Sequence, residues 1–201
     1  MKKQLIAVVS ALAMTFTSLP CVSIATENVP KPVVQYTFDG NKQLADQNGK
    51  NELKLSGDAS VTDDGNKGKG LLLDGTDGYA ELPDNILSSD MTITTWVKIN
   101  KFTTWGRVFD FGTDSNQNFF FTPYSGGASR VEIKNGATVD TMDCTQETAK
   151  DWVNYAITIK GDTVSYYRNG RLIKSKSGIK DISELTNTAN YIGKSHYDGD
   201  A

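Results

Sequence analysis

The strongest constraint on the fold is a series of short apolar segments that are separated by turn residues. The segments Met91–Ile99 and Trp152–Lys160 alternate apolar and polar residues along most of their length. Successive side chains of a β-strand point to opposite faces of a sheet, so this spacing predicts strands with one buried face and one wetter face. No long segment shows the 3.6-residue period of an amphipathic helix, and the pattern therefore indicates an all-β protein.

Turn residues divide the remaining chain into strands of similar length. Asn169-Gly170 predicts a two-residue hairpin and Gly161-Asp162 the turn before it, so Trp152–Ser175 is predicted to be a three-stranded meander. One helical turn is expected, at Asp181–Leu185. Further strands are predicted at Val33–Phe38, Glu52–Leu55, Gly70–Asp74, Gly78–Leu82, Gly106–Phe111, Asn118–Thr122, Arg130–Lys134, Thr138–Met142 and Asn190–Gly193. Many short strands at regular spacing predict a two-sheet antiparallel β-sandwich, or jelly roll.

Composition agrees with a loop-rich β protein and excludes one class of partner. The 201 residues suit one domain, and aspartate, which favours turns, outnumbers glutamate, which favours helices, by 18 to 6. The 21 Lys and Arg residues against 24 Asp and Glu residues give a net charge of −3. A nucleic-acid binder needs clustered cations for phosphate contacts, so we expect no nucleic-acid partner.

The N-terminus has the pattern of an export signal. Lys2 and Lys3 precede the uncharged apolar stretch Leu5–Leu19, and Ser23-Ile24-Ala25 places small residues at the cleavage positions. We expect residues 1–25 to be a signal peptide, 26–32 a linker, and 33–201 a secreted domain. A single-span anchor is the alternative, but the stretch is shorter than the ~20 residues a span needs. We therefore expect no membrane span after cleavage and, with Cys144 then alone, no internal disulfide.

Catalytic motifs are missing from the sequence. Retaining glycosidases need two carboxylates about 5 Å apart, often from a Glu-x-Asp-x-Glu strand, and none is present. A Ser-His-Asp arrangement would have to use His196, the one histidine, without a Gly-x-Ser-x-Gly turn. We therefore expect no catalytic residue in these 201 residues and a binding role for the chain.

Exposed aromatic residues in loops suggest where a ligand binds. Trp105 stands beside Thr103, Thr104 and Arg107, and Tyr124 opens a Ser-Gly-Gly loop. Sugars stack on such rings when polar side chains are close by, and loops on rigid sheets often carry binding sites. Trp105, Arg107 and Tyr124 are therefore the predicted ligand-binding residues. The alternative for each ring is burial under a neighbouring segment.

Several Asp-Gly pairs raise the question of a metal. Calcium takes six to eight oxygen ligands from carboxylates and loop carbonyls. For most of these pairs a simple turn is the better interpretation. Asp39, at the end of the first predicted strand, is the residue we expect to bind a structural calcium ion.

Read in order, eight stretches resemble the bacterial LamG-like (laminin-G type 3) family of concanavalin A-like jelly-roll domains. They are Val34–Gly40, Leu73–Pro83, Met91–Lys98, Arg107–Gly112, Thr122-Pro123, Trp152–Thr158, Tyr167–Leu172 and Asn190–Ser195. The resemblance implies a two-sheet sandwich that serves as an accessory, often carbohydrate-binding, module. Such domains often stand beside arabinan- or xylan-acting glycoside hydrolases. Some relatives bind calcium through an acid near the first strand, which Asp39 matches.

The sequence departs from this family at its C-terminal end. Members usually continue with a closing strand, whereas this sequence stops at Asp198–Ala201. We expect the closing strand to be missing, which would leave its neighbour with an unpaired edge. The resemblance thus predicts a secreted module that binds a plant or microbial polysaccharide. The alternatives are an N-terminal accessory domain of a truncated glycoside hydrolase and a cell-surface adhesion module.

Overall fold

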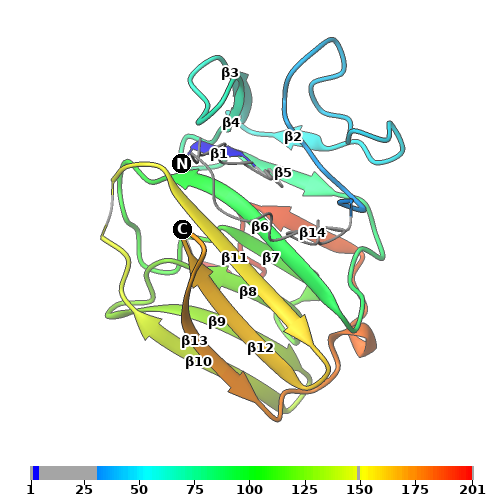
Figure 1. Cartoon of the computed structure of the whole chain (residues 1–201), viewed down its shortest axis with the longest axis vertical. Coiled ribbons are helices and arrows are strands. Elements are labelled where there is room, and N and C mark those ends of the chain that lie inside the picture. Colours follow the sequence, from blue (N-terminus) through cyan, green and yellow to red (C-terminus); the bar gives the residue numbers. More distant parts are fainter. Residues whose placement is uncertain (1, 5–30, 149, 201) are drawn as a thin grey trace, which may run out of the picture.

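The chain folds into two seven-stranded antiparallel sheets that face each other (Figure 1). The computed structural model describes residues 2–4, 31–148 and 150–200. The first sheet has the order β13 (Arg171–Ser177), β12 (Thr163–Arg168), β11 (Val153–Lys160), β6 (Met91–Lys98), β1 (Lys2–Gln4), β4 (Gly70–Leu72) and β3 (Ser60–Thr62). The second has the order β10 (Thr138–Thr145), β9 (Ala128–Asn135), β8 (Gln117–Thr122), β7 (Phe109–Asp114), β14 (Ala189–Ile192), β5 (Tyr79–Leu82) and β2 (Lys54–Ser56). The predicted all-β sandwich is confirmed.

Alternation along the strands builds the core between the two sheets. In β11, four alternate residues are each 2% exposed: Val153, Tyr155, Ile157 and Ile159. The second sheet meets them with aromatic residues, and the rings of Phe121 and Tyr155 lie 5.2 Å apart, edge to face. Burial of such side chains contributes roughly 1.5–3 kcal/mol each, so this interlayer contact is a main source of stability.

The predicted meander is confirmed in both its order and its turn. β11, β12 and β13 follow one another as antiparallel neighbours. Asn169 and Gly170 have φ angles of 50° and 76°. Two consecutive positive φ values are the requirement of a type I′ turn, which matches the twist of the flanking strands. The predicted helical turn is also present, as the 3₁₀ turn Ile182–Glu184.

The predicted strands differ from the structure in several places. The segment Val33–Phe38 is not a strand, although Tyr36 and Phe38 are 0% and 2% exposed. The strand predicted from Gly106 begins at Phe109, and β3 lies in a segment for which no strand was predicted. An apolar pattern reports burial, and burial does not require pairing with a neighbouring strand.

β1 lies inside the first sheet, between β4 and β6, and is antiparallel to both. The edge strands of that sheet are β13 and β3. The remainder of the predicted signal peptide and most of the predicted linker lie outside the described residues. None of the described residues belongs to a helix with the length and hydropathy that a membrane crossing requires.

Candidate functional site

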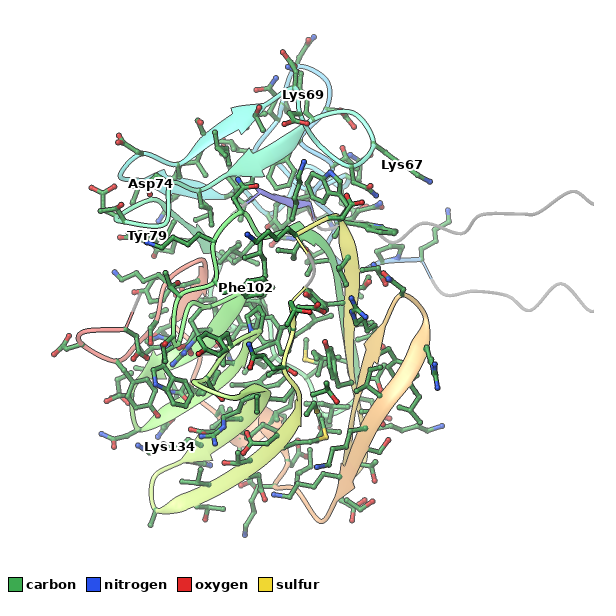
Figure 2. The ribbon with its side chains drawn as sticks, turned by 90° about the vertical axis from the view of Figure 1, so that its left-hand side faces the viewer. Lys67, Lys69, Asp74, Tyr79, Phe102 and Lys134 are labelled. Carbon is green, nitrogen blue, oxygen red and sulfur yellow. The ribbon has the colours of Figure 1, made fainter. Side chains whose placement is uncertain are left out.

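The outer face of the second sheet carries the predicted ligand-binding region. Core residues such as Phe119 and Phe121 point inward from β8, so Phe120 between them points outward. Strand register places Phe120 beside Asp110 of β7 and Glu132 of β9. Figure 2, which views the sandwich turned by 90°, shows Tyr79 and Lys134 on this same side of the molecule. This face therefore has polar and charged residues set around an aromatic floor.

Trp105 stands at one border of this face in an unusual backbone conformation. Its φ angle is +63°, in the left-handed region that residues other than glycine seldom adopt. The Trp105 amide donates to the Tyr124 carbonyl over 2.8 Å, which links the two loops that carry these rings. Both side chains are partly exposed. Strained backbone at a partly exposed ring is a frequent feature of binding sites.

Arg107 fixes this border from inside the protein. Its side chain is 1% exposed, and its guanidinium carbon lies 3.9 Å from the centre of the Phe120 ring. The guanidinium donates to the Trp105 carbonyl at 2.7 Å, to Asp110 at 3.2 Å and to Asp200 at 2.8 Å. The Arg107 charge is therefore paired within the protein. Its contacts position the Trp105 loop and hold the C-terminal segment in place.

The segment 194–200 forms the other border and contributes Tyr197. The His196 backbone amide and ring Nδ1 lie 3.1 and 2.7 Å from the Asp110 carboxylate, which is fully buried. This attachment sets the Tyr197 ring 6.4 Å from the Phe120 ring and 5.4 Å from the Lys134 ammonium. Trp105 and Tyr197 thus lie on either side of the Arg107–Phe120 stack.

Charged side chains of β9 and β10 complete the surface between the two rings. The Arg130 guanidinium makes a bidentate contact with the Asp143 carboxylate, with N–O distances of 2.6 and 3.0 Å. Its central carbon lies 5.2 Å from the centre of the Trp105 ring. The hydrogen bonds from Arg130 lower the pKa of Asp143. Glu132 accepts a hydrogen bond from Thr141 over 3.2 Å. We call the surface formed by Trp105, Phe120, Arg130, Glu132, Lys134 and Tyr197 the tryptophan face. It offers two rings with donors and acceptors between them.

The structure brings all three predicted ligand-binding residues together. Trp105 and Tyr124 are adjacent and partly exposed, whereas Arg107 is enclosed and reaches the surface only through the residues that it positions. Sequence reasoning missed Tyr197, because nothing local distinguishes a loop tyrosine that contacts β8 from any other. The alternation of Arg130, Glu132 and Lys134 in β9 was the one signal that could have placed them on a common face.

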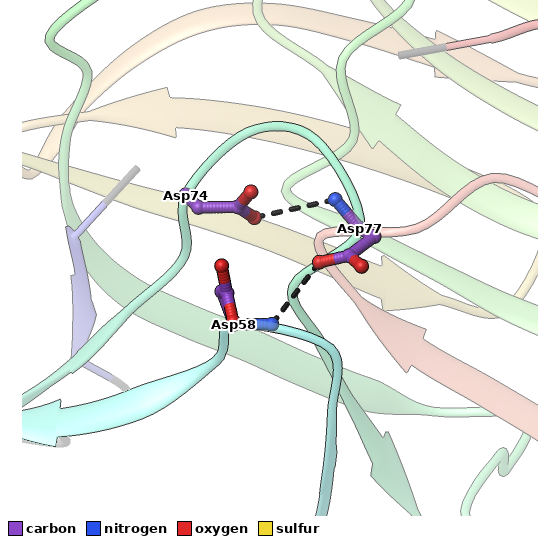
Figure 3. Close-up of side chains that lie close together, drawn as sticks. All are labelled: Asp58, Asp74 and Asp77. Carbon is purple, nitrogen blue, oxygen red and sulfur yellow. Dashed lines mark hydrogen bonds between the residues drawn. The ribbon is translucent and has the colours of Figure 1, made fainter.

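Asp39, the predicted calcium ligand, is exposed and tied to a loop. Its Oδ1 accepts from the Lys69 backbone amide over 3.0 Å. Three other aspartates, Asp58, Asp74 and Asp77, place carboxylate oxygens within 4.8 Å of one another (Figure 3). Oδ1 of Asp74 accepts from three successive backbone amides, which is turn chemistry. Calcium binding through Asp39 remains a prediction, which melting with and without a chelator tests.

Comparison with known proteins shows the family. The family model described as the concanavalin A-like lectin/glucanases superfamily matches residues 74–201, and the chain belongs to this family. The resemblance to LamG-like domains is therefore confirmed.

One curated relative is much longer than this chain. An α-L-arabinofuranosidase from Bifidobacterium longum subsp. longum is 26% identical over 201 aligned positions, covering 85% of this chain. The match covers 18% of that relative, so the chain spans about a fifth of its length.

Two solved structures share the architecture. One is domain 4 of an extracellular GH43 arabinanase from Geobacillus stearothermophilus in complex with arabinotriose, with a TM-score of 0.70, 22% identity, and 82% and 84% of the two chains covered. The other is the binding domain of botulinum neurotoxin serotype D/C, with a TM-score of 0.60, 14% identity, and 77% and 41% covered. At these identities the likeness is one of fold.

Proposed function

We propose that this chain is a non-catalytic carbohydrate-binding module and that the tryptophan face holds the saccharide. The observation that carries the proposal is the Trp105 ring, which is partly exposed and stands on strained backbone whose amide donates a hydrogen bond to the Tyr124 carbonyl. A sugar ring presents apolar C–H groups on its faces and hydroxyls around its rim. The Trp105 ring suits the former, and the partly exposed charged groups of Arg130 and Lys134 suit the latter.

Arabinose-containing polysaccharides are the first ligands to test. The Bifidobacterium relative is an arabinofuranosidase, and the arabinanase domain of similar fold was solved with arabinotriose. These relatives support arabinan as the starting point, and xylan and pectin follow as comparisons. Export by the predicted signal peptide would bring the module to such polymers outside the cell.

Affinity electrophoresis in gels that contain each polysaccharide tests the proposal. We expect arabinan to retard the wild-type chain and to retard Trp105→Ala at least tenfold more weakly. Trp96→Ala is the matched control, because Trp96 is partly exposed on the outer face of the opposite sheet. Its retardation should equal that of the wild type. Unretarded migration of the wild type in all three gels would overturn the proposal.

A second proposal is that the module acts as the accessory domain of a larger arabinose-releasing hydrolase. It is favoured by one observation, the match to 18% of an arabinofuranosidase. Reading the gene beyond codon 201 tests it: a hydrolase sequence in frame would support the proposal, and an immediate stop codon would overturn it. An adhesion module on the cell surface is the competing outcome, supported if a protein ligand binds and no glycan does.

A further inference from the structure

A second aromatic cluster lies on the outer face of the second sheet, beyond the tryptophan face. Ala80 and Leu82 of β5 are buried, so Tyr79, which precedes Ala80 in the alternation, points outward. Tyr191 of β14 points outward in the same way, because its two neighbours in the strand are buried. The two tyrosine rings lie 5.6 Å apart, edge to face, and both residues are partly exposed. They therefore present an aromatic surface to the solvent.

Lys194 stands over both of these rings. Its ammonium lies 4.2 Å from the centre of the Tyr79 ring and 4.7 Å from the centre of the Tyr191 ring. Gly193 allows this position, because its φ angle is +87° and a Cβ there would clash with the Leu73 side chain. The faces of aromatic rings attract a cation, so the two rings hold the ammonium in place. We call Tyr79, Tyr191 and Lys194 the tyrosine site.

The positive charge of Lys194 has no acidic partner in the described part of the chain. No carboxylate among those residues forms an ion pair with its ammonium. Glu81, which lies opposite Tyr191 on this face, has Lys54 of β2 directly opposite it on its other side. Asp110 of β7 is buried and already paired. An ammonium group has three N–H donors, so Lys194 suits an anion from outside the chain.

The tyrosine site and the tryptophan face lie on the same face of the sheet. Tyr191 and Phe120 belong to one row of the strand register, with β7 between their strands. Two strand spacings, or roughly 9–10 Å, therefore separate the two aromatic clusters. The segment 194–200 contributes to both, through Lys194 at one end and Tyr197 near the other. A saccharide of several sugar units that crosses the strands can therefore contact both clusters.

We propose that the tyrosine site binds a uronic acid residue of an acidic polysaccharide, while a neutral sugar of the same polymer lies on the tryptophan face. A uronic acid carries its carboxylate directly on the sugar ring. The Lys194 ammonium binds this carboxylate, and the exposed parts of the Tyr79 and Tyr191 rings contact the apolar face of the sugar. Hydrogen bonds between charged groups are stronger than neutral ones, so the site favours an acidic sugar over a neutral one. This inference rests on the proposed function and adds the class of substrate.

Calorimetric titration of the full chain with two forms of one polymer tests the site. The first form is polygalacturonate, and the second is the same polymer with its carboxylates methyl-esterified and therefore uncharged. We expect the wild type to bind the charged form about tenfold more tightly, and Lys194→Met to lose this preference. Lys194→Arg keeps the cation and should keep the preference. Lys160→Met is the control and should match the wild type, because Lys160 is exposed at the end of β11 in the opposite sheet.

The outcomes separate this inference from the proposed function. Equal binding of the two forms by the wild type, or a full preference in Lys194→Met, would overturn the tyrosine site. A loss in Lys194→Arg as large as that in Lys194→Met would contradict the role of the charge. Retardation of the wild type by arabinan without a preference for the charged polymer would overturn this inference alone. Failure of the wild type to bind arabinan or either form of the polymer would count against the proposed function as well.

Discussion

At the scale of single residues, Trp105 combines a proposed ligand contact with backbone strain, and two substitutions separate them. Glycine adopts a φ of +63° freely, whereas alanine at that angle costs roughly 1–2 kcal/mol. We therefore expect Trp105→Gly to have a free energy of unfolding about 1 kcal/mol above that of Trp105→Ala. Both variants should lose arabinan retardation equally, because both lack the ring. Equal stabilities in urea unfolding would show that the backbone is not strained there.

Arg107 is the residue whose loss should be most damaging. It is buried with its charge paired to Asp110 and Asp200, so Arg107→Ala would leave a buried carboxylate without its cation. We expect a loss of about 3–5 kcal/mol in the free energy of unfolding. Arg171→Ala, at an exposed position in β13, should change it by less than about 0.5 kcal/mol. Comparable losses for the two in urea unfolding would contradict this account of Arg107.

At the scale of elements, the sequence predicts what local chemistry determines. Period-two alternation located β6 and β11, and Asn169-Gly170 located the hairpin between β12 and β13. The tryptophan face needed tertiary information, because two segments far apart in the sequence, the Trp105 loop and 194–200, supply its borders. The same holds for Val33–Phe38, where Tyr36 and Phe38 are buried although the segment joins no sheet.

The hairpin turn provides a quantitative test at this scale. Gly170 has a φ of 76°, so Gly170→Ala should lower the free energy of unfolding by roughly 1–2 kcal/mol. Gly127→Ala is the control, since Gly127 is exposed, lies outside the left-handed region and has no atom close to an added Cβ. Denaturant unfolding of the two variants checks the difference. A cost at Gly127 as large as that at Gly170 would contradict the turn assignment.

At the scale of the whole molecule, several aspartates link stability to pH in the same direction. The pKa of Asp143 is lowered by hydrogen bonds from Arg130, and that of Asp181 by hydrogen bonds from Ser183. Backbone hydrogen bonds from Thr76 and Gly78 lower the pKa of Asp74. Each carboxylate therefore binds protons more weakly in the folded chain than in the unfolded chain, where aspartate has a pKa of about 3.9.

A carboxyl group with a lowered pKa in the folded chain stabilises the fold when the pH is above its pKa in the unfolded chain. This stabilisation is lost as the pH falls through its pKa in the folded chain. We expect Tm to be nearly constant between about pH 7 and pH 5 and to fall steeply below about pH 4. Asp143→Asn should have a lower Tm than the wild type at pH 7. At pH 3 this difference in Tm should be smaller, because the Arg130 contact of the variant does not depend on ionisation of residue 143. Since the Asp143 side chain is 48% exposed, salt should weaken its effect. Thermal melts of both proteins across this pH range measure the prediction, and a difference in Tm that widens on acidification would contradict the assigned sign.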